Sequence, residues 1–295
     1  MTPASWEHSG SYFTIGKHRH FVVDRGRDPE QKKEKETVVL VHGYPTSSYD
    51  FKDVLARLML HYRVVIHDHL GFGLSDKPAD YSYSIMEQAD RALALWQHLG
   101  IQRAHLVAHD YGTTVATELI ARRNLGAGFL PIELQSLTLS NGSVHIELAK
   151  LRMIQKLLRN KRIGPIIARL SSKRVFNKNM RELWYDPDAL LPDEIDAMWD
   201  LLTRGGGRDV LPPSTQYLRE RELYWHRWVG ALQANRLRTL FLWGRHDPIT
   251  GEAIARVHHE EMPGSQLRIL ENAGHYPQVE TPVEWANGLL KFLQG

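Results

Sequence analysis

Largely apolar stretches of about five residues constrain the fold of this chain more than any other feature. Residues 37–41 and 62–66 are of this kind, and a stretch with helical spacing of its apolar residues separates them. Strands buried on both faces of a parallel sheet have such sequences, whereas strands with one solvated face alternate apolar and polar residues. Further strands are predicted at 104–107, 134–139, 239–243 and 266–270, and helices at 49–60, 84–99, 113–123, 251–261 and 282–293. This alternation predicts an α/β fold with a mostly parallel, doubly wound sheet.

The alternation stops between residues 142 and 235. Amphipathic helical stretches fill this region, no strand is predicted in it, and prolines divide it. A predicted hairpin and a charged loop precede the first buried strand, at 12–16, 20–24 and 25–36. The sequence therefore predicts a core domain, residues 1–141 and 236–295, with a helical cap domain, residues 142–235, inserted after the sixth strand.

Composition excludes several kinds of chemistry. The chain has 295 residues and no Cys, which rules out disulfides, thiolate metal sites and a cysteine nucleophile. No apolar run approaches the ~20 residues that a membrane span requires, and the first eight residues do not form a secretory signal. The net charge of +3 does not suggest a nucleic-acid partner. We expect a soluble, cytoplasmic protein, either a monomer or a homodimer.

Charge is distributed unevenly within the predicted cap. Residues 150–181 contain eleven Lys or Arg and no Asp or Glu, whereas residues 182–200 contain seven acidic residues and no basic one. Two oppositely charged surfaces of one subdomain, solvated or facing each other, would explain this pattern. A basic face for membranes or anionic partners is the alternative.

A carboxylate stands at a sharp turn from strand to helix. Residues 108–112 read Ala-His-Asp-Tyr-Gly, directly after the predicted strand 104–107. This is the pattern of a nucleophile elbow with Asp110 in the place of the usual Ser. A carboxylate attacks a saturated carbon to form an ester that water can cleave, whereas its attack on an ordinary ester would give an anhydride. The sequence thus favours epoxides or alkyl halides as substrates, although Asp110 could also be a helix N-cap.

Other reactive side chains follow further strands of the predicted sheet. Residues 42–45 follow the first buried strand, Asp247 follows the strand at 239–243, and His275 follows the last one. Ligands of such sheets bind beyond the carboxyl ends of the strands, so these residues are expected to meet there. The chain order is nucleophile, acid, histidine, with Asp110 first.

These motifs resemble those of α/β-hydrolase fold enzymes, in the branch of epoxide hydrolases and haloalkane dehalogenases. The motifs are the Asp110 elbow, His-Gly-Tyr-Pro at 42–45, Asp68 with Gly-Phe-Gly-Leu-Ser at 71–75, and the segment around His275. The resemblance extends from Tyr12 to Phe292. The cap segment at 228–232 also resembles mesoderm-specific transcript type hydrolases. The loop at 71–75 is interpreted as structural, because its glycines permit tight turns.

The resemblance implies a role for each residue. Asp110 would attack the substrate, and His275, oriented by Asp247, would activate the water that cleaves the resulting ester. The backbone N–H groups of Tyr44 and Tyr111 would bind the oxyanion. Some relatives take the acid from the loop after the preceding strand, where this chain has Asn141 and then Glu147. Asn141 cannot be an anionic partner, which favours Asp247.

The cap is expected to decide between epoxides and halides. Epoxide hydrolases protonate the epoxide oxygen with cap tyrosines, and Tyr217 occupies a suitable position, with Tyr185 as a weaker second candidate. Dehalogenases use a Trp after the nucleophile together with an Asn or a second Trp, whereas this chain has Tyr111 and Tyr44.

We therefore predict an epoxide hydrolase that opens a small hydrophobic epoxide to a vicinal diol through a covalent Asp110 ester, without a cofactor or a metal. A haloalkane dehalogenase with the same triad is the alternative. A non-catalytic ligand-binding protein on a hydrolase fold is a third reading, which the complete triad disfavours.

Overall fold

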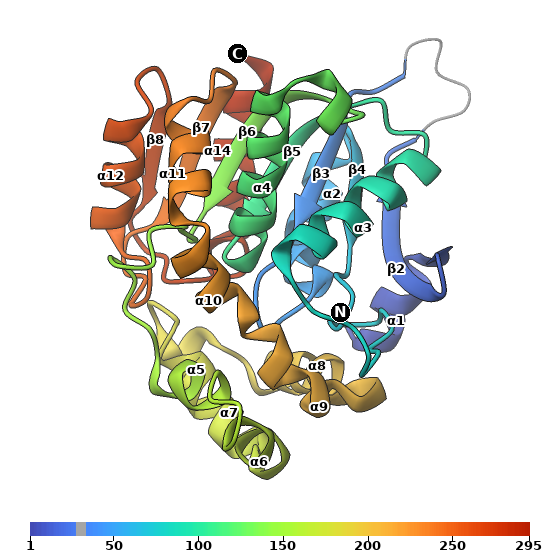
Figure 1. The fold of residues 1–295 in the computed structure, drawn as a ribbon, viewed down its shortest axis with the longest axis vertical. Helices are drawn as coiled ribbons and strands as arrows, with labels where there is room; N and C mark the ends of the chain where they lie inside the picture. The colour runs from blue at the N-terminus through green and yellow to red at the C-terminus, as the bar shows by residue number, and fades with distance from the viewer. Residues whose placement is uncertain (28–33) are drawn as a thin grey trace.

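The computed structural model describes residues 1–27 and 34–295, so residues 28–33 of the predicted charged loop lie outside the described part. The described strands form one eight-stranded sheet in the order β1-β2-β4-β3-β5-β6-β7-β8 (Figure 1). The strands are β1 Ser11–Ile15, β2 His18–Arg25, β3 Thr37–Val41, β4 Arg63–His67, β5 Arg103–His109, β6 Glu133–Ser140, β7 Arg238–Gly244 and β8 Gln266–Leu270. β1, β2 and β4 pair antiparallel in succession, and the pairs from β4 to β8 are parallel.

The apolar sequence of the central strands follows from burial on both faces. Every residue of β3 and β4 is buried. Val39, in the middle of β3, pairs with Val65 on one side and with Leu106 on the other. Both flanking strands are parallel to β3, as the sequence predicts. The doubly wound α/β architecture is therefore confirmed.

Helices cover both faces of the sheet. The helices of this core are α1 Pro3–His8, α2 Lys52–Leu58, α3 Ile85–His98, α4 Tyr111–Leu125, α12 Glu252–Glu261, α13 Pro277–Glu280 and α14 Pro282–Gln294. α3 packs against α4 on one face, and α14 packs against α2 on the other (Figure 1). The predicted start of α3 is correct, because the Ser84 hydroxyl accepts a hydrogen bond from the Glu87 N–H. The short helices α1 and α13 were not predicted.

The segment between β6 and β7 is helical throughout its regular structure. It contains α5 Met153–Leu158, α6 Gly164–Leu170, α7 Lys173–Arg181, α8 Pro192–Thr203, α9 Gly207–Ser214, α10 Gln216–Leu223 and α11 Trp225–Gln233. Helices α5 to α9 lie beyond the carboxyl ends of the strands, whereas α11 runs beside α4 (Figure 1). The end of the predicted cap thus packs on the core.

Glu118 of α4 attaches α11 to the core. Its buried carboxylate accepts hydrogen bonds from Arg227 Nε and Trp228 Nε1, at 2.8 and 2.9 Å, and from Arg122 on its own helix. Burial disfavours the ionised carboxyl, but these three donors outweigh it and lower the pKa of Glu118. Ion pairs and hydrogen bonds to Glu118 therefore help to hold α11 against α4.

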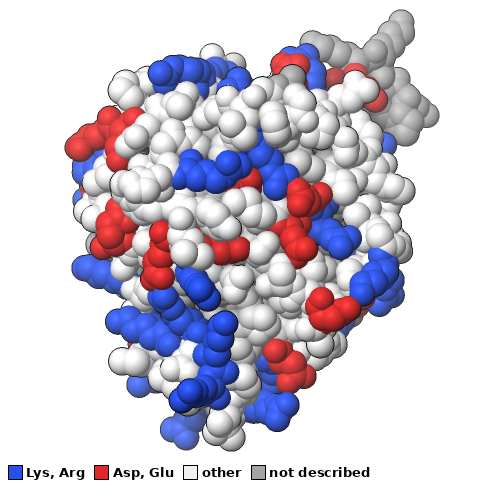
Figure 2. Space-filling model, in the orientation of Figure 1, with Lys and Arg blue, Asp and Glu red and all other residues white. Residues whose placement is uncertain are grey.

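The basic stretch 150–181 lies mainly on α5, α6 and α7. Lys and Arg gather over these helices on the lower part of the surface in Figure 2. Several of these cations pair with acids further along the chain, in the pairs Arg152–Glu182, Arg159–Glu222 and Lys173–Asp196. Part of the positive charge is therefore compensated within the molecule. Among the described residues, the structure contains no helix that is both long and apolar enough to cross a membrane.

Candidate active site

Asp110 occupies a strained turn between β5 and α4. Its φ of 46° is in a region that non-glycine residues rarely adopt, and such strain is concentrated at functional sites. The turn needs glycines around it: a Cβ on Gly112 would lie 2.5 Å from Val41 O, and one on Gly142 would lie 2.5 Å from Asp110 O. The Asp110 side chain makes no capping hydrogen bond to α4. The N-cap explanation therefore fails, and the carboxylate is presented at the carboxyl end of β5.

His275 connects the two buried carboxylates. Its Nδ1 lies 2.8 Å from Asp247 Oδ2, and its Nε2 lies 3.6 Å from Asp110 Oδ2. Asp247 belongs to the loop after β7 and His275 to the loop after β8, so three strand ends supply the three residues. Their arrangement is that of a nucleophile, a base and the acid that orients the base.

Asp247 accepts hydrogen bonds from several groups besides His275. Its Oδ1 accepts from the Ile249 and Thr250 N–H groups, at 2.7 and 3.1 Å. Its Oδ2 accepts from the Thr250 hydroxyl at 2.5 Å and from Asn141 Nδ2 at 2.9 Å. The sequence excluded Asn141 as an anionic partner of His275. The structure shows that its amide instead donates to Asp247 and so orients that carboxylate. Sequence reasoning missed this role, although its position after the preceding strand was the available signal.

The ion pair shifts both members towards their charged forms. Burial opposes ionisation of Asp247, but the His275 charge and the hydrogen bonds from His275, Thr250 and Asn141 outweigh it and lower its pKa. Burial likewise disfavours the imidazolium, yet Asp247, and then Asp110, raise the pKa of His275 to about 9. Both carboxylates therefore favour the protonated, charged form of His275.

One of the two predicted backbone donors contacts the Asp110 carboxylate. The Tyr44 N–H, in the loop after β3, donates to Asp110 Oδ1 over 2.8 Å. The Tyr111 N–H belongs to the first residue of α4, where the helix dipole favours negative charge. Both predicted oxyanion donors are therefore adjacent to Asp110, and one already contacts it.

An apolar cavity of about 100 Å³ opens onto Asp110 and His275. Its walls come mainly from α5, α7, α8 and α9, and the apolar lining residues include Ile154, Leu158, Val175, Phe176, Met180, Trp199, Leu202 and Leu211. The amides of Gln155 and Asn179 also line it. The helical segment thus encloses the carboxylate in a largely apolar space.

The two predicted cap tyrosines occupy different environments. Tyr217 is buried, and its ring lies 5.7 Å from that of Tyr44 and 5.2 Å from that of Tyr111. Its hydroxyl accepts from Gln155 Nε2 at 3.1 Å, and Gln155, not Tyr217 itself, is among the residues that line the cavity. Burial and then the charge of Asp110 raise the pKa of Tyr217, so its phenol stays protonated.

Tyr185 does not join the site. Its side chain is 45% exposed, and its ring stacks on His246 with 4.5 Å between the ring centroids. It is not among the residues that line the cavity.

Sequence reasoning also missed Arg221, one turn after Tyr217 on α10. Its guanidinium is buried and lies over the Tyr217 ring at 4.7 Å from the centroid. Its Nε donates to Thr114 Oγ1 at 2.8 Å, and its Nη2 lies 3.4 Å from the Asp110 carbonyl oxygen. The i, i+4 spacing from Tyr217 was the signal that could have identified it.

The loop at 71–75 has the structural role that its glycines indicate. Asp68 accepts from the Ser48 N–H and the Leu74 N–H, both at 2.7 Å. Gly73 has a φ of 51°, and a Cβ there would lie 2.2 Å from Asp68 Oδ2. The loop therefore closes over a buried carboxylate, and any larger residue at 73 would collide with it.

Comparison with known proteins identifies the family to which the fold belongs. A family model described as alpha/beta hydrolase fold matches residues 36–282. The chain is 36% identical over 302 residues to the mesoderm-specific transcript homolog protein of Bos taurus, covering 99% of this chain and 89% of that protein. It is 39% identical over 257 residues to LipZ of Mycobacterium tuberculosis, which is named as a hydrolase, covering 87% of this chain and 88% of that protein.

Solved structures share the architecture. A haloalkane dehalogenase DbeA variant from Bradyrhizobium elkanii superposes with a TM-score of 0.79 at 20% identity, covering 97% of each chain. The epoxide hydrolase CorEH superposes with a TM-score of 0.75 at 18% identity, covering 97% of this chain and 98% of that one. At such identities the likeness concerns the fold alone, so neither substrate transfers to this chain. Family model, relatives and fold agree, and the chain belongs to the α/β hydrolase fold family.

Proposed function

We propose that this hydrolase opens epoxides to vicinal diols through a covalent ester of Asp110. The observation that carries the proposal is the position of the Asp110 carboxylate. It stands on a strained turn, faces His275 at 3.6 Å and lines a mainly apolar cavity. A carboxylate nucleophile reacts productively with a saturated carbon, and this chemistry excludes ordinary esters as substrates.

The first half-reaction uses Asp110 and Tyr217. Asp110 Oδ1 is held by the Tyr44 N–H, which leaves Oδ2 to attack one ring carbon. The C–O bond of the epoxide breaks, and the alkoxide takes the phenolic proton of Tyr217. Gln155 lies between this hydroxyl and the cavity, so the transfer requires its amide to move aside. The raised pKa of Tyr217 keeps that proton in place beforehand, and the Arg221 guanidinium over its ring stabilises the phenolate afterwards.

The second half-reaction uses the charge change at Asp110. Esterification removes the negative charge that helps to keep His275 protonated, so the pKa of His275 falls. His275 gives up its proton, which restores the Tyr217 phenol through solvent, and the neutral ring becomes the base. His275 then takes a proton from water, whose oxygen attacks the carboxyl carbon of the ester. The Tyr44 and Tyr111 N–H groups bind the oxyanion. Collapse releases the diol and restores the Asp110 carboxylate.

A haloalkane dehalogenase is the second candidate. Asn179 and Trp199 line the same cavity, and both side chains carry N–H groups that could bind a departing halide. The same ester and the same water attack would follow. The two reactions differ in the leaving group, so products distinguish them.

A single-turnover reaction in ¹⁸O-water tests the proposal. Enzyme in excess over styrene oxide should release diol whose new oxygen is unlabelled, and should leave ¹⁸O in the peptide that contains Asp110. Labelled diol with unlabelled Asp110 would mean direct attack by water and would overturn the ester mechanism. Bromide release from 1,2-dibromoethane without diol formation from any epoxide would select the dehalogenase.

A further inference from the structure

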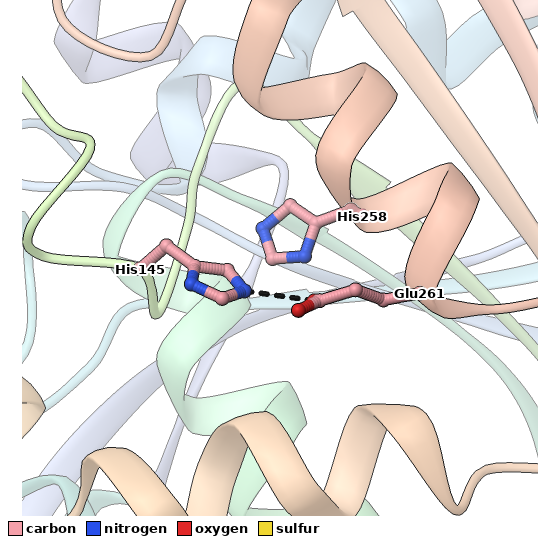
Figure 3. A group of neighbouring side chains, drawn as sticks. All are labelled: His145, His258 and Glu261. Carbon is pink, nitrogen blue, oxygen red and sulfur yellow. Dashed lines mark hydrogen bonds and ion pairs between the residues drawn. The ribbon is translucent and has the colours of Figure 1, made fainter.

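Three potential metal-ligating side chains meet outside the catalytic cavity. His145 comes from the loop after β6, and His258 and Glu261 come from α12 (Figure 3). One donor atom from each of the three lies within 4.8 Å of the other two. Both imidazoles are buried, whereas the Glu261 side chain is 23% exposed. The cluster therefore combines a dry interior with a route from solvent.

His258 has a nitrogen without a partner. Its Nε2 lies 2.8 Å from Ser143 Oγ, but its Nδ1 has no hydrogen-bond partner among the described residues, although the ring is only 1% exposed. Figure 3 shows a ring nitrogen of His258 pointing towards the Glu261 carboxylate. A buried, unpaired nitrogen that faces a carboxylate within such a cluster can bind a cation together with it.

The outer contacts of the two histidines match those of metal ligands. His145 Nδ1 lies 2.6 Å from Glu147 Oε1, while its Nε2 lies 2.8 Å from Glu261 Oε2. A metal-bound histidine usually donates its other N–H to a carboxylate, a carbonyl or a similar acceptor, which fixes the tautomer. Glu147 can accept from His145 in this way, and Ser143 can accept from His258. With these outer contacts in place, the inward nitrogen of His258 has no partner among the described residues, and that of His145 meets only the Glu261 carboxylate, itself a possible ligand.

We infer that His145 Nε2, His258 Nδ1 and the Glu261 carboxylate form a Zn²⁺ site. Two imidazoles and a carboxylate are a donor set that suits zinc, and water would complete the coordination. Zinc bonds of ~2.0–2.1 Å require ligand atoms roughly 3.4 Å apart, so the widest spacing in the cluster must contract. Glu261, partly exposed at the end of α12, can make most of that movement. Hydrogen bonding alone explains His145, but leaves His258 Nδ1 unsatisfied.

The site joins three parts of the fold. Glu147, which supports His145, also accepts from Trp225 Nε1 at 2.8 Å, and Glu261 Oε1 accepts from Gln233 Nε2 at 3.2 Å. Trp225 and Gln233 are the first and last residues of α11. The cation thus holds two parts of the helical segment against α12: the start of the segment and its last helix, α11. None of the three ligands lines the catalytic cavity, so the role is structural rather than chemical.

Equilibrium dialysis of the chelator-stripped full chain against Zn²⁺ tests the inference. Elemental mass spectrometry should find one zinc per chain, and Tm should rise with free zinc concentration. Cobalt(II) in place of zinc should give the visible absorption bands of a tetrahedral site. Zinc below one per chain at saturation, or cobalt without these bands, would overturn the site.

Paired variants on α12 locate the cation. Glu261→Gln and His258→Gln should each weaken zinc binding by at least ~10-fold. The neighbours Glu260→Gln and His259→Gln should bind zinc as the parent does. Glu261→Gln is decisive because its side chain is partly exposed, and circular dichroism should show that it folds normally. Unchanged binding by folded Glu261→Gln would place the zinc elsewhere and overturn the inference.

Discussion

Asn141 Nδ2 donates to Asp247 Oδ2 over 2.9 Å, so the carboxylate that orients His275 is itself oriented from the neighbouring strand. The same Asn141 side chain accepts from the Gly244 N–H at 2.8 Å. One amide therefore joins the end of β6 to the end of β7 and to the carboxylate that contacts His275. Its φ of 41° shows that the backbone is held in an unusual conformation to place it there.

Replacement of Asn141 by Ala should impair both folding and turnover. The Gly244 N–H and Asp247 Oδ2 would lose buried partners, at a cost of about 1–3 kcal/mol in the free energy of unfolding. Loss of an outer hydrogen bond to the acid should lower kcat by roughly 10-fold. Urea unfolding and steady-state diol formation measure the two effects. Unchanged kcat would show that Thr250 and the backbone donors suffice to orient Asp247.

The raised pKa of His275 predicts how stability depends on pH. The native pKa of about 9 exceeds the ordinary value of 6.5, so this group stabilises the fold fully below pH 6.5 and loses its contribution as pH rises through 9. The loss is on the order of 3 kcal/mol for an isolated group. Unfolding free energies measured from pH 6 to 10 should fall more steeply for the parent protein than for His275→Gln. Parallel curves for the two proteins would contradict the shift.

Tyr217→Phe should reduce epoxide opening specifically. Removal of the proton donor should lower kcat for styrene oxide by about 10²-fold or more. Any halide release should change far less, because a halide needs no proton. Tyr185→Phe is the matched control and should retain full activity, since its ring is half exposed and stacked on His246. Equal activity of Tyr217→Phe and the parent would remove Tyr217 from the mechanism.

The apolar cavity wall should set substrate size. Phe176→Ala enlarges the space beside Met180 and Trp199, so kcat/KM for a bulky aromatic epoxide should rise relative to that for propylene oxide. The truncation should also cost about 3 kcal/mol of stability or more, because Phe176 belongs to the buried core of this segment. Competition between the two epoxides, analysed by product ratio, measures the preference. A ratio equal to that of the parent would mean that Phe176 does not limit the cavity.

Glu118→Gln should loosen α11 from α4. Neutralising this carboxylate weakens its contacts with Arg227, Trp228 and Arg122, at an expected cost of about 1–3 kcal/mol. Glu133→Gln is the surface control: its partner Arg103 is as exposed as itself, and the cost should stay below about 1 kcal/mol. Equal destabilisation of the two variants, measured by urea unfolding, would contradict the anchoring role of Glu118.

The sheet and the positions of Asp110, Asp247 and His275 could be predicted from local sequence patterns, because each depends on residues that are close together in the chain. Burial on both faces leaves the central strands few choices but apolar residues, so β3 and β4 were predicted almost to the residue. Asp110, Asp247 and His275 each follow such a strand, and parallel strands bring their carboxyl ends to one edge.

The features that sequence analysis missed depend on distant partners. α11 has the amphipathic pattern of any cap helix, and only Glu118, more than a hundred residues away, assigns it to the core. Helical spacing likewise does not reveal that Tyr185 faces outward. The contact of Gln155 with Tyr217 joins two helices whose relative placement no local pattern encodes.

At the turn of positive φ around Asp110, the residues that permit the backbone conformation differ from the residue whose side chain the turn presents. Gly112 and Gly142 make room for the turn, so a larger residue at either position would change the path of the backbone without changing the side chain at 110. Another small polar side chain at 110 would occupy the same buried place beside the cavity and would change which bonds can be attacked. In the proposed mechanism the side chain at 110 would therefore set the class of reaction, whereas the loops after β3, β7 and β8 would supply the donor, the acid and the base.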